Sequence, residues 1–166
     1  MSYADLNTLF CVRTCPNGTY ASDTVTRVCT TNCSAYSSTY ADNITNRCTA
    51  KCPIPYYADN TTYLCVLYCP SAVDYYADPH SQTCVKNCPS GSTWVSFADT
   101  RPRACVTRCA EGSYGVNSTQ RCVDKCPITE WADEELNLCV LNCTVRPGLY
   151  KEKNSQACLP ECPNSP

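Results

Sequence analysis

Residues 48–65 read CTAKCPIPYYADNTTYLC, and the same plan recurs along the whole 166-residue chain. Two cysteines four positions apart are followed by a proline, a variable stretch, an aromatic-Ala-Asp triplet and a turn that leads to the next cysteine. The 18 cysteines form nine such Cys-x-x-x-Cys pairs, from Cys11 and Cys15 to Cys158 and Cys162. A unit of this size cannot bury a core alone and depends on cross-links and on its neighbours. The sequence therefore predicts a cross-linked repeat array.

The composition agrees with that prediction. Leu, Ile, Val and Phe together account for 26 of the 166 residues. This fraction is below the roughly 20 % that a chain with a packed core usually has, whereas cysteines number 18. Disulfides in such numbers persist in oxidising compartments, so we expect a secreted, extracellular or cell-surface protein. The net charge of −2 does not favour nucleic-acid binding, and no apolar run approaches the roughly 20 residues that span a bilayer. The first residues lack the features of a signal peptide, so we expect a piece of a longer exported protein.

One aromatic residue occupies a fixed position in every unit. It precedes the following cysteine by eight residues, except that Tyr20 precedes Cys29 by nine. The step from the second cysteine of a pair to the aromatic is five, seven or nine residues, always odd, as expected for strands whose side chains alternate with period two. The Asp of the triplet suits the start of a turn, so we predict β-hairpins. The aromatics, predicted to pack modules together, are Tyr3, Tyr20, Tyr40, Tyr57, Tyr76, Phe97, Tyr114, Trp131 and Tyr150.

The cysteine spacing narrows the disulfide connectivity. Val, Thr or Leu follows the first cysteine of every pair, and Pro follows six of the nine second cysteines, which favours extended links. Four extended steps cover roughly 13 Å, beyond the roughly 7 Å limit of a disulfide. We predict that each second cysteine pairs with the next first cysteine, while a crossed pairing of first with third and second with fourth remains the alternative. The forward pairs are Cys15–Cys29, Cys33–Cys48, Cys52–Cys65, Cys69–Cys84, Cys88–Cys105, Cys109–Cys122, Cys126–Cys139 and Cys143–Cys158.

Cys11 and Cys162 are left over, and the two ends of the chain fit each other. Placing Met1 after Pro166 creates another ordinary unit, with seven steps from Cys162 to Tyr3 and eight from Tyr3 to Cys11. We expect an inter-repeat or intermolecular disulfide at these two cysteines, in a tandem array or a head-to-tail polymer; a segment simply cut from an array is the alternative. The expected modules are 11–29, 29–48, 48–65, 65–84, 84–105, 105–122, 122–139, 139–158, and 158–166 continuing into a 1–11-like segment.

The run Cys-Val-x-x-Cys-Pro, then an aromatic and the next Cys-Val, resembles the single-disulfide modules of the growth-factor-receptor, furin-like cysteine-rich domains over essentially the whole chain. In that family such modules stack as a rod of disulfide-closed β-fingers, and similar long arrays are common in surface proteins of ciliates and other protists. The two-disulfide modules of the receptors are absent here. The resemblance thus implies a fold and a location but no ligand. The expected fold is small, disulfide-rich and all-β: a linear rod, or solenoid-like stack, of about nine hairpin modules without a single hydrophobic core.

Six Asn-x-Ser/Thr sequons are the clearest candidate modification sites. Three of them share one place, three residues after the aromatic, at the expected hairpin tip, and two have a cysteine at the middle position, which can compete with glycosylation. The tip sequons are Asn43, Asn60 and Asn117, the cysteine-containing ones are Asn32 and Asn142, and the sixth is Asn17.

No residue pattern predicts a catalytic, metal-binding or ligand-binding site. The aromatics could form a ladder for sugars or peptides, but a fixed repeat position favours packing. One Asp per module falls short of the six to eight oxygens that calcium takes, and the cysteine spacing does not match zinc sites. The single histidine has no catalytic partner in the pattern. We therefore expect no enzyme activity, no catalytic or metal site and no cofactor.

The leading functional hypothesis is a structural glycoprotein repeat of an extracellular filament, surface coat or stalk. Its expected partners are copies or adjacent repeats of itself and N-linked glycans, without nucleic acid and without a membrane segment in this chain. The alternative is the ectodomain of a cell-surface receptor or adhesin that binds a ligand. A protease inhibitor is a third reading, in which the longest loop, with Trp94 and Phe97, would be reactive.

Overall fold

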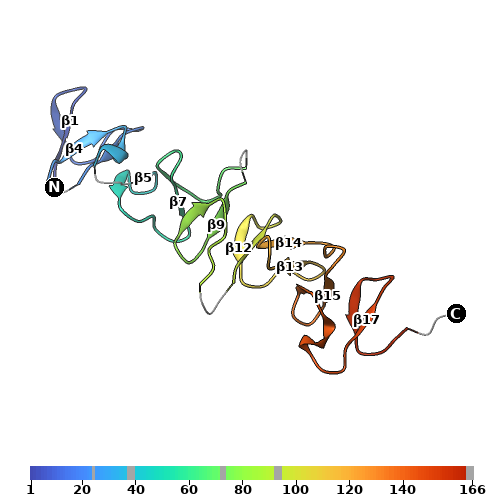
Figure 1. Cartoon of the computed structure of the whole chain (residues 1–166). Helices are drawn as coiled ribbons and strands as arrows, with labels where there is room; N and C mark the ends of the chain where they lie inside the picture. Colours follow the sequence, from blue (N-terminus) through green and yellow to red (C-terminus); the bar gives the residue numbers. More distant parts are fainter. Residues whose placement is uncertain (24, 37–39, 72–73, 92–94, 164–166) are drawn as a thin grey trace. The chain divides into compact units, whose positions relative to one another are not determined.

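The computed structural model describes residues 1–23, 25–36, 40–71, 74–91 and 95–163. Trp94 lies outside these ranges. The secondary structure is all-β, apart from two single turns of 3-10 helix in the described ranges, which confirms the predicted fold class. The chain divides into two compact units, Met1–Val85 and Lys86–Pro166. Within each unit, short hairpins follow one another in chain order (Figure 1).

The described residues of the first unit form five antiparallel hairpins, each made of two strands that are neighbours in the sequence. The strands are β1 (Tyr3–Asp5), β2 (Phe10–Val12), β3 (Tyr20–Ala21), β4 (Val28–Thr30), β5 (Tyr40–Asp42), β6 (Arg47–Thr49), β7 (Tyr57–Asp59), β8 (Leu64–Val66), β9 (Tyr76–Asp78) and β10 (Thr83–Val85). The 3-10 helix η1 (Cys33–Ala35) precedes β5.

The second unit repeats the plan with four hairpins in its described residues. The strands are β11 (Phe97–Asp99), β12 (Ala104–Val106), β13 (Tyr114–Val116), β14 (Arg121–Val123), β15 (Trp131–Asp133), β16 (Leu138–Val140), β17 (Tyr150–Glu152) and β18 (Ala157–Leu159). The 3-10 helix η2 (Cys143–Val145) precedes β17.

Each hairpin joins the aromatic-Ala-Asp triplet to the strand that holds the next cysteine. In β7 and β8, for example, Ala58 lies opposite Cys65 and Tyr57 lies opposite Val66. The half-cystine therefore lies across from a small alanine, and Ala58 is buried. A larger side chain at this position would compete with the disulfide for space.

Eight disulfides close the hairpins, and they are the forward pairs predicted from the spacing rather than the crossed ones. Their Cα–Cα distances of 5.4 to 5.7 Å are ordinary for disulfides. The bonds are Cys15–Cys29, Cys33–Cys48, Cys52–Cys65, Cys69–Cys84, Cys88–Cys105, Cys109–Cys122, Cys126–Cys139 and Cys143–Cys158. In the chain-entropy model, loops of 13 to 17 residues contribute about 3 kcal/mol each.

The prediction that the arms between a second cysteine and its aromatic are extended strands is wrong. In the shortest arms the chain turns back at once, since the N–H of Thr19 donates to the Pro16 carbonyl at 3.0 Å and that of Tyr56 to the Pro53 carbonyl at 2.7 Å. Two longer arms contain η1 and η2 instead. Strand alternation therefore does not account for the odd arm lengths, and the structure offers no other physical reason for them.

Candidate functional site: the contact between successive hairpins

The feature that recurs most regularly beyond the hairpin itself is its contact with the next hairpin. The first strand of a hairpin pairs in parallel with the second strand of the hairpin that follows it, as β1 does with β4 and β5 with β8. The second unit repeats this pairing, for example between β13 and β16. Within each unit, each hairpin is thus bonded to its successor in one register.

One backbone hydrogen bond is the centre of this contact. The N–H of the middle residue of the triplet donates to the carbonyl of the residue two places before the next hairpin's cysteine, at 2.7 to 2.9 Å. The pairs, donor first, are Ala4–Arg27, Ala21–Asn46, Ala41–Tyr63 and Ala58–Gln82 in the first unit, and Ala98–Gln120, Gly115–Asn137 and Ala132–Gln156 in the second.

The residue two places before the cysteine of the second strand, which is the acceptor in the seven pairs above, has a left-handed backbone in every hairpin, with φ between 48° and 61° although none of these residues is glycine. They are Leu9, Arg27, Asn46, Tyr63, Gln82, Arg103, Gln120, Asn137 and Gln156. This conformation costs roughly 1–2 kcal/mol for an L-residue and is hardest for β-branched side chains. Sequence reasoning missed the position, yet a signal existed, because no Val, Ile or Thr occurs among the nine.

Two of these residues, Asn137 and Gln156, also bond to the preceding hairpin through their side chains. The amide of Asn137 donates to the Cys109 carbonyl at 2.8 Å, and that of Gln156 donates to the carbonyls of Pro127 at 2.7 Å and Glu130 at 3.0 Å. These acceptors lie in the arm of the preceding hairpin. Backbone and side chain therefore hold the same neighbour, which helps to offset the backbone strain.

In the triplets that end in Asp, this residue organises the turn that presents the carbonyl. Asp59 is fully buried and accepts hydrogen bonds from the N–H of Thr61 at 2.9 Å and from the hydroxyls of Thr61 and Thr62 at 2.7 Å. Burial raises the pKa of Asp59, but the hydroxyls of Thr62 and Thr61 and the N–H of Thr61 lower it more, so its pKa lies below the usual value. The role predicted for the Asp, to begin a turn, is the one observed.

Related carboxylates behave alike. The Thr8 hydroxyl and the Asn7 N–H lower the pKa of Asp5, and Ser155 together with the Asn154 N–H lowers the pKa of Glu152. Both carboxylates accept hydrogen bonds from the residues of their own turns.

The aromatics differ in burial, and several contact the following hairpin of their unit. Tyr3, Tyr76 and Phe97 are buried, Tyr150 is exposed, and the half-buried members are Tyr20, Tyr40, Tyr57, Tyr114 and Trp131. Tyr3 lies in a cluster with the Cys15–Cys29 disulfide and Ala21, and Tyr40 packs on the cluster of Cys52, Ala58 and Cys65. In these clusters an aromatic covers the disulfide of the next hairpin.

Gly115 shows how tight the contact is. It stands where most triplets have alanine, and a Cβ placed on it would lie 2.7 Å from the ring of Phe97 in the preceding hairpin. Phe97 is only 2 % exposed, so its ring has little room to move away. The glycine therefore makes space for a fully inserted ring.

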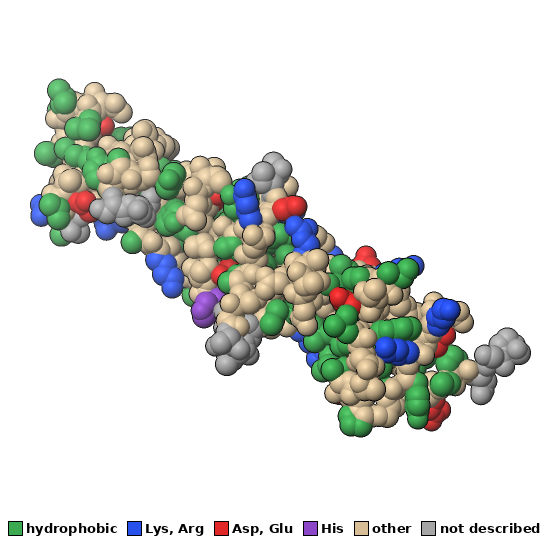
Figure 2. Space-filling model, in the orientation of Figure 1, with side chains coloured by type: hydrophobic (Ala, Val, Ile, Leu, Met, Phe, Trp, Pro, Cys, Tyr) green, Lys and Arg blue, Asp and Glu red, His purple; other side chains and the backbone are tan. Residues whose placement is uncertain are grey.

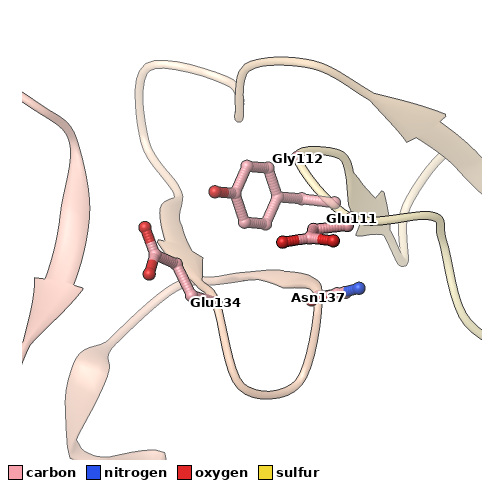
Figure 3. Close-up of a pocket in the computed structure, with 5 residues that line it drawn as sticks. Glu111, Gly112, Glu134 and Asn137 are labelled. Carbon is pink, nitrogen blue, oxygen red and sulfur yellow. The ribbon is translucent and has the colours of Figure 1, made fainter.

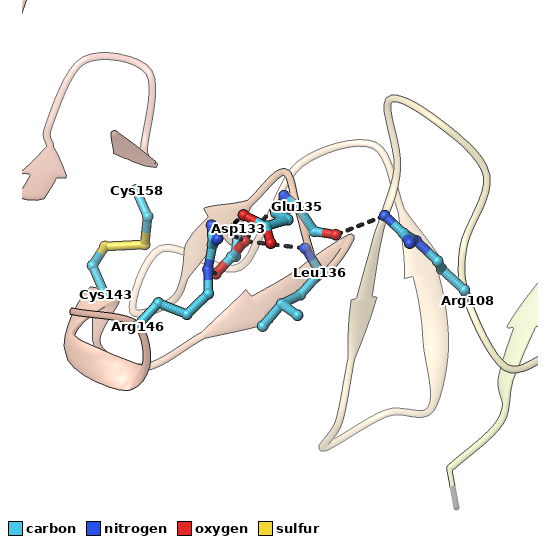
Figure 4. A network of polar contacts seen from close by, with 7 residues as sticks. All are labelled: Arg108, Asp133, Glu135, Leu136, Cys143, Arg146 and Cys158. Carbon is cyan, nitrogen blue, oxygen red and sulfur yellow. Dashed lines mark hydrogen bonds and ion pairs between the residues drawn. A yellow bond between two sulfur atoms is a disulfide. The ribbon is translucent and has the colours of Figure 1, made fainter. Parts of the chain in front are cut away.

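Arg146 adds an ionic link in the second unit (Figure 4). Its guanidinium donates two hydrogen bonds to the buried Asp133, both at 2.9 Å, and pairs with Glu135 as well. Asp133 belongs to β15, whereas Arg146 follows η2 in the arm of the next hairpin. Arg108, in the link between Cys105 and Cys109, approaches the same tip and donates to the Glu135 carbonyl at 2.6 Å. This tip is therefore bonded on two sides.

The sequons fall into two structural classes. The tip residues Asn43, Asn60 and Asn117 are exposed, and the amide oxygens of the first two accept the hydroxyls of Tyr20 and Tyr40 from the preceding hairpins, at 2.5 Å. Because a glycan attaches to Nδ2, this bond to Oδ1 leaves the glycosylated atom unobstructed. By contrast, the side chain of Asn32 caps η1 and that of Asn142 caps η2, and Asn17 is exposed in the first arm.

An open hollow of about 310 Å³ lies between two hairpins of the second unit. Glu134 and Asn137 line it from one turn, and Glu111, Gly112 and Tyr114 line it from the neighbouring segment (Figure 3). Burial and the nearby charge of Glu134 raise the pKa of Tyr114, so this phenol is protonated at neutral pH. No group of three or more potential metal ligands occurs in the ranges that the structure describes.

Cys11 and Cys162 are both unpaired and exposed in the described chain. The described residues also contain no helix long and apolar enough to cross a membrane. Comparison with protein-family models, with curated proteins and with solved structures finds no match. The resemblance to furin-like modules therefore stays a prediction. What is established is a disulfide-rich repeat of β-hairpin units, a construction suited to oxidising surroundings.

Proposed function

We propose that this chain is a structural glycoprotein repeat of an extracellular filament, surface coat or stalk. The observation that supports this most is the backbone bond from each triplet to the next left-handed residue, repeated at 2.7 to 2.9 Å within both units. A contact that recurs in one form between successive hairpins of both units can extend an array indefinitely. Function then lies in length and resistance to unfolding rather than in one pocket.

Covalent closure supports the same proposal. Each disulfide encloses 13 to 17 residues, so a pulled chain lengthens only through the links between hairpins. A reduced chain reaches at most about 3.5 Å per residue, on the order of 580 Å for 166 residues. An oxidised array therefore resists extension that a reduced one permits.

Glycans at the exposed tips fit a surface role. Asn43, Asn60 and Asn117 lie at equivalent tips of their hairpins, so sugars there would shield these turns from proteases. We expect site-resolved mass spectrometry of the secreted protein to find these three asparagines occupied. Asn32 and Asn142 should be far less so, because the cysteine in each sequon enters a disulfide.

Immunoelectron microscopy of the cells that produce the protein tests the proposal. Antibodies raised against the folded chain should decorate filaments, a continuous coat or stalks. Label spread over the plasma membrane, with the extracted protein dispersed as single molecules, would instead favour the receptor or adhesin alternative. The hollow beside Glu111 and Glu134 would then be the first place to examine for a ligand.

A further inference from the structure

Two of the sequon asparagines are bonded to the hairpin that precedes their own. The hydroxyl of Tyr20 donates to Oδ1 of Asn43, and the hydroxyl of Tyr40 donates to Oδ1 of Asn60, both at 2.5 Å. The partners lie 23 and 20 residues apart, so each bond crosses from one hairpin to its successor. Both asparagines are nevertheless exposed. These sequons therefore belong to the contact between hairpins as well as to the hairpin tips.

The geometry of the amide places an attached sugar on the side of this bond. Glycosylation converts the asparagine side chain into a secondary amide, and a secondary amide strongly prefers the trans form. In that form the first sugar carbon points away from Cβ and lies on the edge of the amide that carries Oδ1. The first N-acetylglucosamine of a glycan on Asn60 therefore begins beside the Tyr40 hydroxyl.

A second ring lies next to Tyr40. Tyr63 is the left-handed residue of the hairpin that carries Asn60, and its ring stacks on the Tyr40 ring with centroids 6.4 Å apart and planes inclined by 28°. Tyr63 is 43 % exposed. In Figure 2, where tyrosine is coloured as hydrophobic, side chains of this kind lie on the surface of the first unit. Tyrosine rings suit a sugar, because the C–H face of the sugar packs on the ring and its hydroxyls bond to the phenol.

Both rings are held in place by protein contacts. Tyr40 packs on the buried cluster around the Cys52–Cys65 disulfide. The backbone of Tyr63 is fixed because its carbonyl accepts the N–H of Ala41 at 2.8 Å. A ligand that binds to side chains already in position pays less entropy than one that must order them. The two rings are therefore a preformed surface for a sugar.

The other two tip sequons lack the complete pair of rings. Beside Asn43 the left-handed residue is Asn46 instead of an aromatic, so Tyr20 alone is available. Beside Asn117 the preceding hairpin offers Phe97, which has no hydroxyl and is only 2 % exposed. The chain thus contains a partial site and a site without the rings for comparison.

We infer that Tyr40 and Tyr63 form the binding site for the first N-acetylglucosamine of a glycan on Asn60, and that this sugar bridges two successive hairpins. The sugar is attached to one hairpin and packs on a ring of the hairpin before it. Opening of the contact separates the sugar from Tyr40, so the bound sugar stabilises the closed contact. The inference rests on the proposed glycoprotein function and gives one glycan a mechanical role in it.

Amide hydrogen exchange tests the bridge in the wild-type sequence. The N–H of Ala41 donates across the contact beside Asn60, and the N–H of Ala98 donates across the contact beside Asn117. The glycosylated protein, secreted by a eukaryotic host, is compared with the same chain refolded without glycans from bacteria. Glycosylation should slow exchange at Ala41 about threefold or more and leave exchange at Ala98 unchanged. An unchanged rate at Ala41, or equal slowing at both amides, would overturn the inference.

Ring variants separate the sugar site from a general effect of glycosylation. Tyr63→Gln should remove most of the slowing at Ala41, and glutamine is compatible with the left-handed backbone because Gln82 adopts it at the equivalent position. Tyr68→Gln, at a tyrosine 82 % exposed in the link after β8, should keep the slowing. In the wild-type glycoprotein, nuclear Overhauser effects should connect the sugar to the ring protons of Tyr63. Their absence, or slowing that survives Tyr63→Gln, would contradict a site made by the rings.

The outcomes distinguish this inference from the proposed function. Native filaments or coats whose glycans leave the Ala41 rate unchanged would refute the sugar site alone. Slowing at Ala41 in a protein that is dispersed as single molecules on its cells would refute the proposed filament alone. A native protein without sugar on Asn60 would refute the inference together with the glycoprotein part of the proposal.

Discussion

Residues with a left-handed backbone define this fold at the smallest scale. Among the residues that the structure describes, nine that are not glycine adopt this conformation at equivalent positions, and the carbonyls of seven accept the bond from the preceding hairpin. A strained conformation repeated so regularly is maintained by the contacts around it. The contact between hairpins therefore offsets the cost of the strained backbone at these residues.

Gln82 offers a direct test of that strain. Its φ is 55°, a value that asparagine tolerates and valine does not. We expect Gln82→Val to lower the free energy of unfolding by about 1–2 kcal/mol, and Gln82→Asn to change it by less than about 0.5 kcal/mol. Urea unfolding with intact disulfides measures both. Equal stability of the two variants would contradict a left-handed requirement.

Gly115 and Phe97 form a second test. Gly115→Ala should cost about 1–3 kcal/mol, since the new methyl group overlaps a buried ring. Phe97→Leu removes the ring atoms involved, so the double variant should lose less than the sum of the single losses. Additive losses in a double-mutant cycle would show that the two side chains do not compete for space.

At the scale of the element, a hairpin consists of a triplet, a carboxylate-centred turn and a cysteine strand. The turn depends on the ionised form of its carboxylate, because Thr61 and Thr62 donate to Asp59. The depressed pKa means that the folded state binds fewer protons than the unfolded chain in acid. Its stabilising contribution is therefore present above the unfolded value near 3.8 and is lost as the pH falls through the folded pKa.

The lowered pKa of Asp59 predicts a loss of stability in acid. NMR titration of its carboxyl carbon should give a midpoint below 3.8, and the melting temperature should fall as the pH drops below about 4. Asp59→Asn should be less stable at neutral pH and should show a smaller loss in acid. A midpoint at or above 3.8 would remove the hydrogen-bond explanation.

At the scale of the whole molecule, the free energy of unfolding is approximately the sum of the intrinsic stabilities of the hairpins and of the contact energies between neighbouring hairpins. The buried clusters are small and separate, such as Cys52, Ala58 and Cys65 around one disulfide. A substitution that destabilises one hairpin should consequently affect that hairpin and its neighbours, whereas a substitution in a shared core would destabilise the whole unit.

Removal of one disulfide tests this additivity. Cys52→Ser/Cys65→Ser opens a 13-residue loop, and we expect a local loss of about 3 kcal/mol. Hydrogen exchange should accelerate in β7 and β8 and in the adjacent strands β5 and β10, while β1 and β2 keep wild-type protection. Uniform acceleration through the first unit would indicate one cooperative core.

Much of the hairpin could be predicted from the spacing of the cysteines and aromatics alone, because the distance between two cysteines along the chain limits whether they can form a disulfide. The eight disulfides follow from separations of only 13 to 17 residues, and the aromatic strands and the turn role of Asp59 follow from shorter local steps and from residues whose backbone preferences are strong. The arms could not be predicted in this way, since Pro16 and Pro53 begin turns that the odd lengths alone do not reveal.

The contacts between hairpins required three-dimensional information. Nothing in the local sequence says that Tyr20 will reach Asn43, that Arg146 will neutralise Asp133, or that Gly115 makes room for Phe97. These pairs lie 13 to 23 residues apart, and a unit looks the same in sequence whether or not a neighbour covers it. Proximity across folded surfaces, rather than distance along the chain, selects them, and only folding brings those surfaces together.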